Sequence, residues 1–141
     1  MRLSRFSPFL LALAMSLASV VLVDAQNAPA LAGRWEGTLV PRIQNASRDL
    51  SQRANRPKLP TVVTITTASD GTHSGTWAST SQNAITQISK IAIDGDIVRI
   101  SVTNWGGSWE GRLSADSSTL EGQWTQNGLT SPLVLKKVAT Q

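Results

Sequence analysis

The sequence predicts an all-β fold, an antiparallel up-and-down sheet of about eight strands that closes into a barrel, with an open or half-barrel sheet as the alternative. Three observations predict it. The stretch 107–124, GSWEGRLSADSSTLEGQW, reads nearly the same from both ends. Asp70-Gly71 and Asp94-Gly95 are tight-turn dipeptides between β-branched runs. Apolar and polar residues alternate in TVVTITT and IVRISVT, as they do in half-buried strands.

The symmetrical stretch predicts a β-hairpin with a defined register. Residues directly opposite each other in an antiparallel pair share a face of the sheet. Folding the stretch about Asp116-Ser117 brings like residues opposite, namely Leu113 with Leu120, Gly111 with Gly122 and Trp109 with Trp124. The two Trp-Gly-Leu trios are spaced by two, so each lies on the inward face of its strand.

The remaining elements follow in order along residues 33–138, which we expect to form one domain. A Trp two residues from a Gly occurs again at Trp35/Gly37 and at Gly75/Trp77. Alternating large and small inward residues suit the tapering interior of a curled sheet. Strands are expected at 33–40, 61–68, 72–80, 85–93, 96–103, 107–115, 118–126 and 130–138.

The N-terminal segment, 1–25, has the pattern of a secretory signal peptide. Arg2 and Arg5 precede an uncharged apolar run, Phe9–Val23, and the small residues Val23 and Ala25 suit a signal peptidase. We therefore expect cleavage after Ala25 and a secreted or periplasmic protein with no membrane anchor after cleavage; a retained anchor is the alternative, although the run is short for a membrane span. Residues 26–32 are expected to be a flexible linker and 139–141 a tail.

The absence of cysteine narrows the class of protein. The 141-residue chain contains no Cys, which excludes disulfides, thiolate metal sites and lipid attachment through cysteine. Secretion without disulfides favours a bacterial envelope or extracellular protein.

The net charge of +4 is concentrated in one segment, the basic loop insertion 41–60. It contains a single acidic residue, Asp49, and the candidate partner-binding residues Arg42, Arg48, Arg53, Arg56 and Lys58. An acidic macromolecule or envelope surface is the partner that this charge favours, and the other interpretation is a solvated, partly disordered insertion. Nucleic acid is disfavoured as a partner because no aromatic residues alternate with the cations.

The sequence indicates no enzyme, no metal and no cofactor. Glu36 and Glu110 each follow an inward Trp, so period-two alternation points both carboxylates outward, unlike the pair in a glycosidase. His73 is the one histidine and follows a turn, as solvated surface residues do. Hydrolase, metalloprotease and phosphate-loop motifs are absent.

Five Trp and no Tyr are present, and both Phe lie in the signal peptide. Trp77, Trp109 and Trp124 each lie two residues from a Gly and are candidate ligand contacts. Core packing is the favoured interpretation for them and for Trp35. Trp105 stands outside the paired register, beside two glycines. It is either an exposed ring at the barrel mouth or a bulge residue folded onto the core.

Four segments together carry a family resemblance. They are GRWEGTL, DGTHSGTW, IDGDIVRISV and GSWEGRLSADSSTLEGQWTQNGLTSPLVLKKV. They resemble the secreted bacterial β domain that stands ahead of the catalytic domain in many α/β-hydrolases and also occurs alone. The resemblance covers most of 33–138 and implies a non-catalytic module. The sequence departs from that pattern at 41–60, where a short connection is expected.

A looser resemblance is to lipocalin- and avidin-type barrels. Gly33-Arg34-Trp35 is similar to the lipocalin G-x-W signature, in which the Trp closes one end of the barrel under a basic residue of the last strand. The resemblance implies that Lys136 or Lys137 supplies that residue. The second lipocalin signature is absent.

Two functions follow as hypotheses. The first is a secreted, non-enzymatic binding or accessory module that recognises a macromolecular partner through 41–60 and the Trp105 edge. The alternative is a barrel that holds a small apolar ligand, if the glycines beside the rings leave a cavity.

Overall fold

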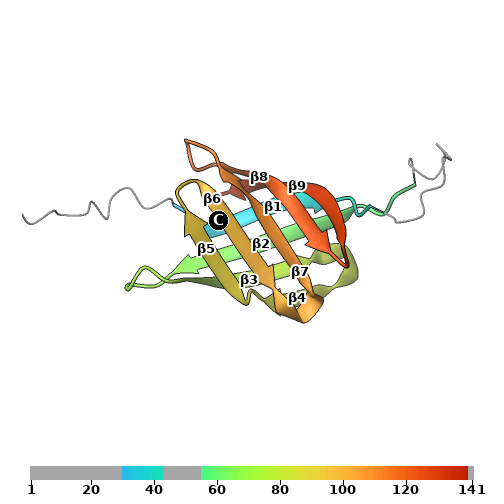
Figure 1. Ribbon diagram of the computed structural model, residues 1–141, viewed down its shortest axis with the longest axis horizontal. Helices are drawn as coiled ribbons and strands as arrows, with labels where there is room; N and C mark the ends of the chain where they lie inside the picture. Colours follow the sequence, from blue (N-terminus) through green and yellow to red (C-terminus); the bar gives the residue numbers. More distant parts are fainter. Residues whose placement is uncertain (1–29, 43–54, 140–141) are drawn as a thin grey trace, which may run out of the picture.

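The computed structural model describes residues 30–42 and 55–139, which form a single antiparallel sheet with almost no helix (Figure 1). Two short 3₁₀ helices, η2 (Thr80–Gln82) and η3 (Thr103–Trp105), join strands of the sheet. The predicted signal peptide, 1–25, and residues 43–54 of the basic loop lie outside the described residues. The strands are β1 (Gly33–Leu39), β2 (Leu59–Thr67), β3 (His73–Ser79), β4 (Ala84–Gln87), β5 (Lys90–Asp94), β6 (Ile97–Val102), β7 (Gly107–Leu113), β8 (Thr119–Gln126) and β9 (Leu129–Val138).

The sheet is strongly curled and stands as a half-barrel, so the open alternative is the one confirmed. Its strand order is β4-β3-β2-β1-β9-β8-β7-β6-β5, with β4 and β5 at the two ends. All pairs are antiparallel, and each pair except β1–β9 joins consecutive strands of the chain. The predicted up-and-down, all-β class is therefore confirmed.

The strand that the sequence predicts at 85–93 is divided, which raises the count from eight to nine. Its first half pairs with β3 and its second half with β6. The change of partner occurs at Ile88, whose N–H donates to Gly75 O at 2.9 Å, and Ser89, whose N–H donates to Ser101 O at 2.8 Å. Two residues therefore carry the chain from one edge of the sheet to the other.

The register predicted from the symmetrical stretch is confirmed. In the β7–β8 pair, Trp109 lies opposite Trp124, and Gly111 opposite Gly122, with the two leucines, Leu113 and Leu120, opposite each other. The buried residues of both strands are the inward members of this pattern.

The glycines between the tryptophans are required by the curl of the sheet. A Cβ atom on Gly122 would lie 2.6 Å from Cζ2 of Trp109, and one on Gly111 would lie 2.5 Å from Cη2 of the same ring. These separations are far below van der Waals contact, and the carbonyl oxygens of Glu110 and Glu121 lie closer still, so only glycine leaves room for the ring and the neighbouring backbone. The indole N–H of Trp109 donates to Leu133 O at 3.1 Å and fixes the ring in place.

The inward side chains form one core. The rings of Trp77 and Trp124 meet across the interior, with centroids 4.7 Å apart and planes tilted by 31°. The buried apolar residues are Leu31, Trp35, Leu39, Val63, Ile65, Trp77, Val98, Ile100, Val102, Trp109, Leu113, Leu120, Trp124, Leu133 and Leu135.

Residues 30–32, which the sequence predicts as part of a linker, belong instead to the folded domain. Leu31 is fully buried, and its carbonyl accepts a 2.9 Å hydrogen bond from the Trp35 indole. Lys137 of β9 donates to Ala30 O at 2.9 Å, and its ammonium lies 5.3 Å from the Trp35 ring centroid. Leu31 thus covers this end of the core beside Trp35. The composition of the segment before β1 does not predict this contact.

The β7–β8 turn is built around one carboxylate. The hydroxyls of Ser114 and Ser118 donate to Asp116 Oδ1 at 2.6 and 2.7 Å. These two bonds, then the Ser118 N–H, lower the pKa of Asp116 from 3.8 to about 2. Ser117 next to it adopts φ 57°, which turns the chain.

We expect Gly122→Ala to destabilise the protein by about 1–3 kcal/mol because the new methyl group displaces the Trp109 ring from a packed core. Urea unfolding followed by tryptophan fluorescence measures the change. Gln123→Ala, on the exposed face one residue away, is the matched control. An unchanged midpoint for Gly122→Ala would contradict the ring-on-glycine packing.

We expect the Asp116 turn to weaken in acid. Because the folded pKa lies below the unfolded one, the contribution of Asp116 to stability is present above pH 4 and is lost as the pH falls from about 4 to about 2. Asp116→Ala should therefore flatten the fall in unfolding free energy over this pH range. Urea titrations at successive pH values test this, and equal slopes for both proteins would refute it.

Candidate functional site

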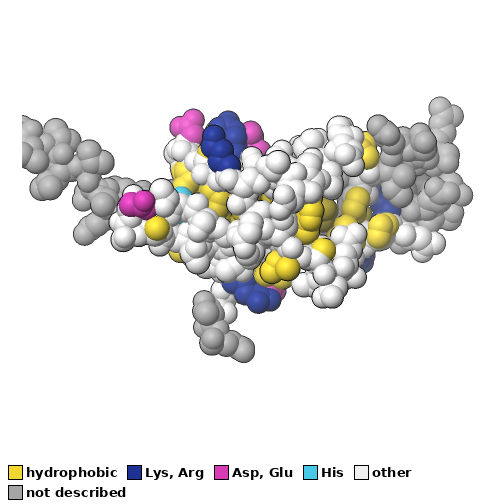
Figure 2. All heavy atoms as spheres, turned by 90° about the horizontal axis from the view of Figure 1, so that it is seen from below, with side chains coloured by type: hydrophobic (Ala, Val, Ile, Leu, Met, Phe, Trp, Pro, Cys, Tyr) yellow, Lys and Arg dark blue, Asp and Glu magenta, His cyan; other side chains and the backbone are white. Residues whose placement is uncertain are grey.

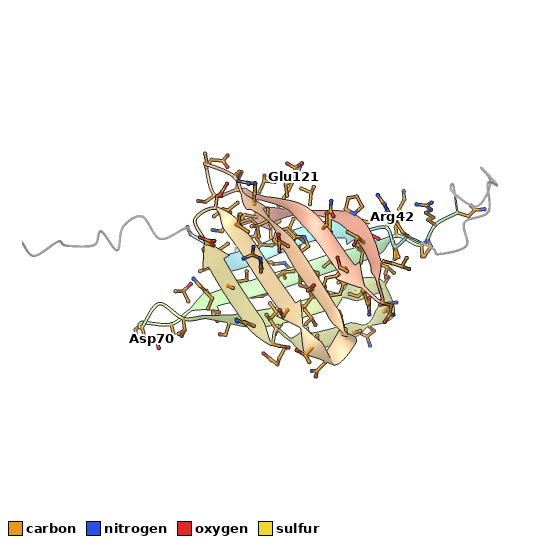
Figure 3. The ribbon with its side chains drawn as sticks, in the orientation of Figure 1. Arg42, Asp70 and Glu121 are labelled. Carbon is orange, nitrogen blue, oxygen red and sulfur yellow. The ribbon has the colours of Figure 1, made fainter. Side chains whose placement is uncertain are left out.

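The up-and-down order sends alternate connections to opposite ends of the sheet. We call one end the basic end; it comprises residues 40–42, 55–58, 80–83, 103–106 and 127–128. The other, the aspartate end, comprises residues 30–32, 68–72, 95–96 and 114–118. Figure 3 shows Arg42 and Asp70 at opposite ends of the molecule. Each candidate residue lies at one end, in the interior or on the outer face of the sheet.

Three of the five predicted partner-binding cations lie in described residues, and all three lie at the basic end. Arg42 and Lys58 are exposed and flank residues 43–54, the part of the loop that lies outside the described residues. Arg48 and Arg53 belong to that part. Arg56 is half-buried, and its Nε atom has no hydrogen-bond partner within residues 30–42 and 55–139. The N–H of Arg42 donates to Ser131 Oγ at 2.9 Å, which anchors the start of the loop to β9.

The two ends differ in charge. No Asp or Glu occurs among the described residues of the basic end, whereas Asp70, Asp96 and Asp116 lie in turns of the aspartate end and Asp94 directly precedes one. The ion pairs between described residues are Arg34–Glu36, Arg99–Glu110 and Arg112–Asp96. None of them involves a cation of the basic end. The positive charge there is therefore not compensated by described carboxylates.

Trp105 also lies at the basic end, as the last residue of η3. Its ring packs against the core and remains partly exposed, and Gly106 reverses the chain after it with φ 61°. The Gln126 amide donates to Trp105 O at 2.7 Å and its oxygen accepts from the Trp124 indole at 3.3 Å. Gln126 thus fixes Trp105 to β8. The sequence did not signal this role, because the contact joins residues of different hairpins.

Hydroxyl groups cover the core at the basic end. Thr61, Ser79 and Ser131 are the buried polar residues of the described chain. Thr61 donates to Leu59 O at 3.1 Å, and Ser131 accepts from Arg42. The Ser79 hydroxyl has no partner among the described residues.

The candidate ligand-binding rings lie in the core. Trp77, Trp109 and Trp124 are each at most 4 % exposed. The Trp109 ring occupies the space beside the glycines, and the other two rings contact each other. The glycines therefore accommodate the rings, and the barrel-closing candidate, Trp35, is fully buried under Lys137.

The candidate catalytic groups do not converge. Glu36 and Glu110 are exposed on β1 and β7 and are held by Arg34 and Arg99 at 2.7 Å. His73 Nδ1 lies 2.8 Å from the Thr67 hydroxyl on the neighbouring strand. Among residues 30–42 and 55–139, no group of three metal-ligating side chains occurs.

A groove on the outer face was not predicted from the sequence. It has a volume of about 560 Å³ and crosses β7, β8 and β9 over Gly111 and Gly122. Outward polar and charged side chains line it, including Glu121, which is labelled in Figure 3. Gly111 and Gly122, which accommodate Trp109 on the inner face, also leave a depression on the outer face because they have no side chains. Two glycines at opposite positions of a predicted hairpin are therefore the sequence feature from which this groove could be predicted.

On the face seen from below Figure 1, backbone and uncharged polar side chains make up most of the surface, with hydrophobic side chains scattered among them and clusters of charged groups at the upper and lower margins (Figure 2). Ile85 of β4, 70 % exposed, is the most exposed large hydrophobic residue that the structure describes. In these same residues, no helix is long and apolar enough to span a membrane.

We expect two buried serines of the basic end to respond differently to alanine. Ser131→Ala removes the acceptor of the Arg42 N–H and should cost about 1 kcal/mol of unfolding free energy. Ser79→Ala removes an unpartnered hydroxyl and should leave stability unchanged or raise it. Urea unfolding of both variants makes the comparison. Equal destabilisation would mean that the Ser79 hydroxyl has a partner.

The chain matches no protein-family model and no curated protein. The resemblances to the hydrolase-associated β domain and to lipocalin-type barrels therefore remain predictions from the motifs quoted above.

Proposed function

We propose that this protein is a secreted, non-enzymatic binding module whose basic end docks on an anionic surface of the cell envelope. The observation that carries the proposal is the charge distribution: Arg42, Arg56 and Lys58 lie at one end, with no described carboxylate among them. Two further cations, Arg48 and Arg53, belong to the same loop. Cations near an anionic surface are attracted within a Debye length of it.

Trp105 supports the choice of this end. Its ring is partly exposed beside η3, and a Trp with one apolar and one wet side suits an interface. The bond from Gln126 to its carbonyl holds the ring where the cations gather. The docking surface thus combines positive charge with one aromatic contact.

The interior supports a surface function over an internal one. The Trp77 and Trp124 rings contact each other, and the Trp109 ring covers the glycines. A small apolar ligand would need space that these rings fill. Glu36 and Glu110, the two carboxylates considered as a glycosidase pair, are engaged by Arg34 and Arg99 on the outer face.

We expect the protein to sediment with vesicles that contain phosphatidylglycerol and not with vesicles of phosphatidylcholine alone. Arg42→Glu combined with Lys58→Glu should weaken this binding at least about thirtyfold, because each cation near an anionic surface contributes about 1 kcal/mol. Both side chains are exposed, so the fold should be preserved. Added salt should weaken binding of the unsubstituted protein.

The matched control is Arg112→Glu with Lys136→Glu, the same change in net charge at exposed positions away from the basic end and away from β5. Equal loss of binding in this control would show that net charge, not the basic end, attracts the vesicles. Equally tight binding to duplex DNA would overturn the choice of an envelope surface.

A further inference from the structure

The half-barrel leaves one edge of β5 without a hydrogen-bonded partner strand, and the start of β3 lies across a groove from this edge. β5 pairs with β6 on one side and ends the sheet on the other. No backbone hydrogen bond joins residues 90–94 to β3 in the described part of the chain, since the last bond to β3 is made by Ile88. An edge of this kind presents N–H and C=O groups to an incoming strand.

The surface beside this edge is partly apolar. A groove of about 460 Å³ runs between β5 and the start of β3. Ile91 and Ile93 line the groove, pack against the core and are only half-buried, whereas their β6 partners, Ile100 and Val98, are fully buried. A strand added here would cover both isoleucines.

The sequence of β5, Lys-Ile-Ala-Ile-Asp, is complementary to itself in the antiparallel sense. Pairing two copies about Ala92 places Lys90 opposite Asp94 of the second copy, and Ile91 opposite Ile93. Each of these pairs lies on one face of the sheet, since the isoleucines share the core side and the charged residues the outer side. Parallel pairing would instead place like charges side by side.

Lys90 and Asp94 are free to make such pairs. Both are exposed, and neither takes part in the ion pairs between described residues. Opposite charges directly across two strands stabilise the pair, and like charges destabilise it. A two-fold dimer would contain the Lys–Asp pair two times, once with the lysine of each subunit, because such an interface uses the same patch on both subunits.

We infer that β5 is a dimerisation edge, on which a second copy of this chain adds its own β5 in antiparallel register centred on Ala92. The combined sheet would run β6-β5-β5-β6 across the two-fold axis. Ile91 and Ile93 of both copies would be covered by the added strands. This inference does not depend on the proposed envelope binding.

Charge exchange at the two ends of β5 tests the register. Sedimentation equilibrium of the full chain across a dilution series should show a reversible dimer. Lys90→Asp places carboxylates opposite each other and Asp94→Lys places ammonium groups opposite each other, so each should raise the dimer dissociation constant about tenfold. The double variant, Lys90→Asp with Asp94→Lys, should restore it. An equimolar mixture of the two single variants should form a mixed dimer.

The control is Lys136→Asp, an exposed lysine of β9 that undergoes the same change in charge and should leave dimerisation unchanged. Tryptophan fluorescence verifies that each variant is folded. A protein that stays monomeric at every concentration would overturn the inference. So would single variants that dimerise as well as the original, or a double variant that fails to recover.

Discussion

The fit of the Trp109 ring against Gly111 and Gly122 is the contact on which the rest of the structure depends. The ring lies where Cβ atoms of the two glycines would stand, so both strands must approach it closely. This approach requires a strongly curled sheet, because flat strands would leave the ring without contact on its other side. The curl in turn brings β3 and β8 across from each other, where Trp77 meets Trp124.

Local pattern determined much of what could be predicted. The register of β7 and β8 followed from the symmetry of their own residues, because a one-residue slip would move every inward side chain to the solvent face. The outward orientation of Glu36 and Glu110 followed from the same period of two. These inferences need only the geometry of a strand and its neighbour in the chain.

Features that depend on distant contacts could not be predicted. The change of partner at Ile88 and Ser89 depends on where β3 and β6 lie, and the burial of Leu31 depends on the place of the Trp35 indole, which donates to the Leu31 carbonyl. At the basic end, the sequence hypothesis combines the 41–60 loop with the Trp105 edge but gives no spatial relation between Arg42 and Trp105. Their common position required the direction of every strand between them, and the role of Gln126 required the completed fold.

The charges of the two ends have different uses within the fold. Asp70 and Asp116 accept hydrogen bonds from nearby hydroxyls and N–H groups and so complete their turns. Arg42 and Lys58 complete no turn that the structure describes. The acidic residues thus serve the chain itself, whereas these cations are available to a partner.

The β1–β9 pair has a consequence for how the chain can be connected. It is the pair that joins strands distant in the sequence, and its register places Arg34 opposite Val138. The beginning and the end of the folded domain therefore lie on adjacent strands at the same end of the sheet. A short peptide joining them would complete another hairpin, and the β8–β9 turn at Asn127-Gly128 could then be opened to give a circular permutant with the same sheet. In that permutant β9 and β1 would be consecutive strands of one hairpin, and the pair between strands distant in the sequence would be β8–β9.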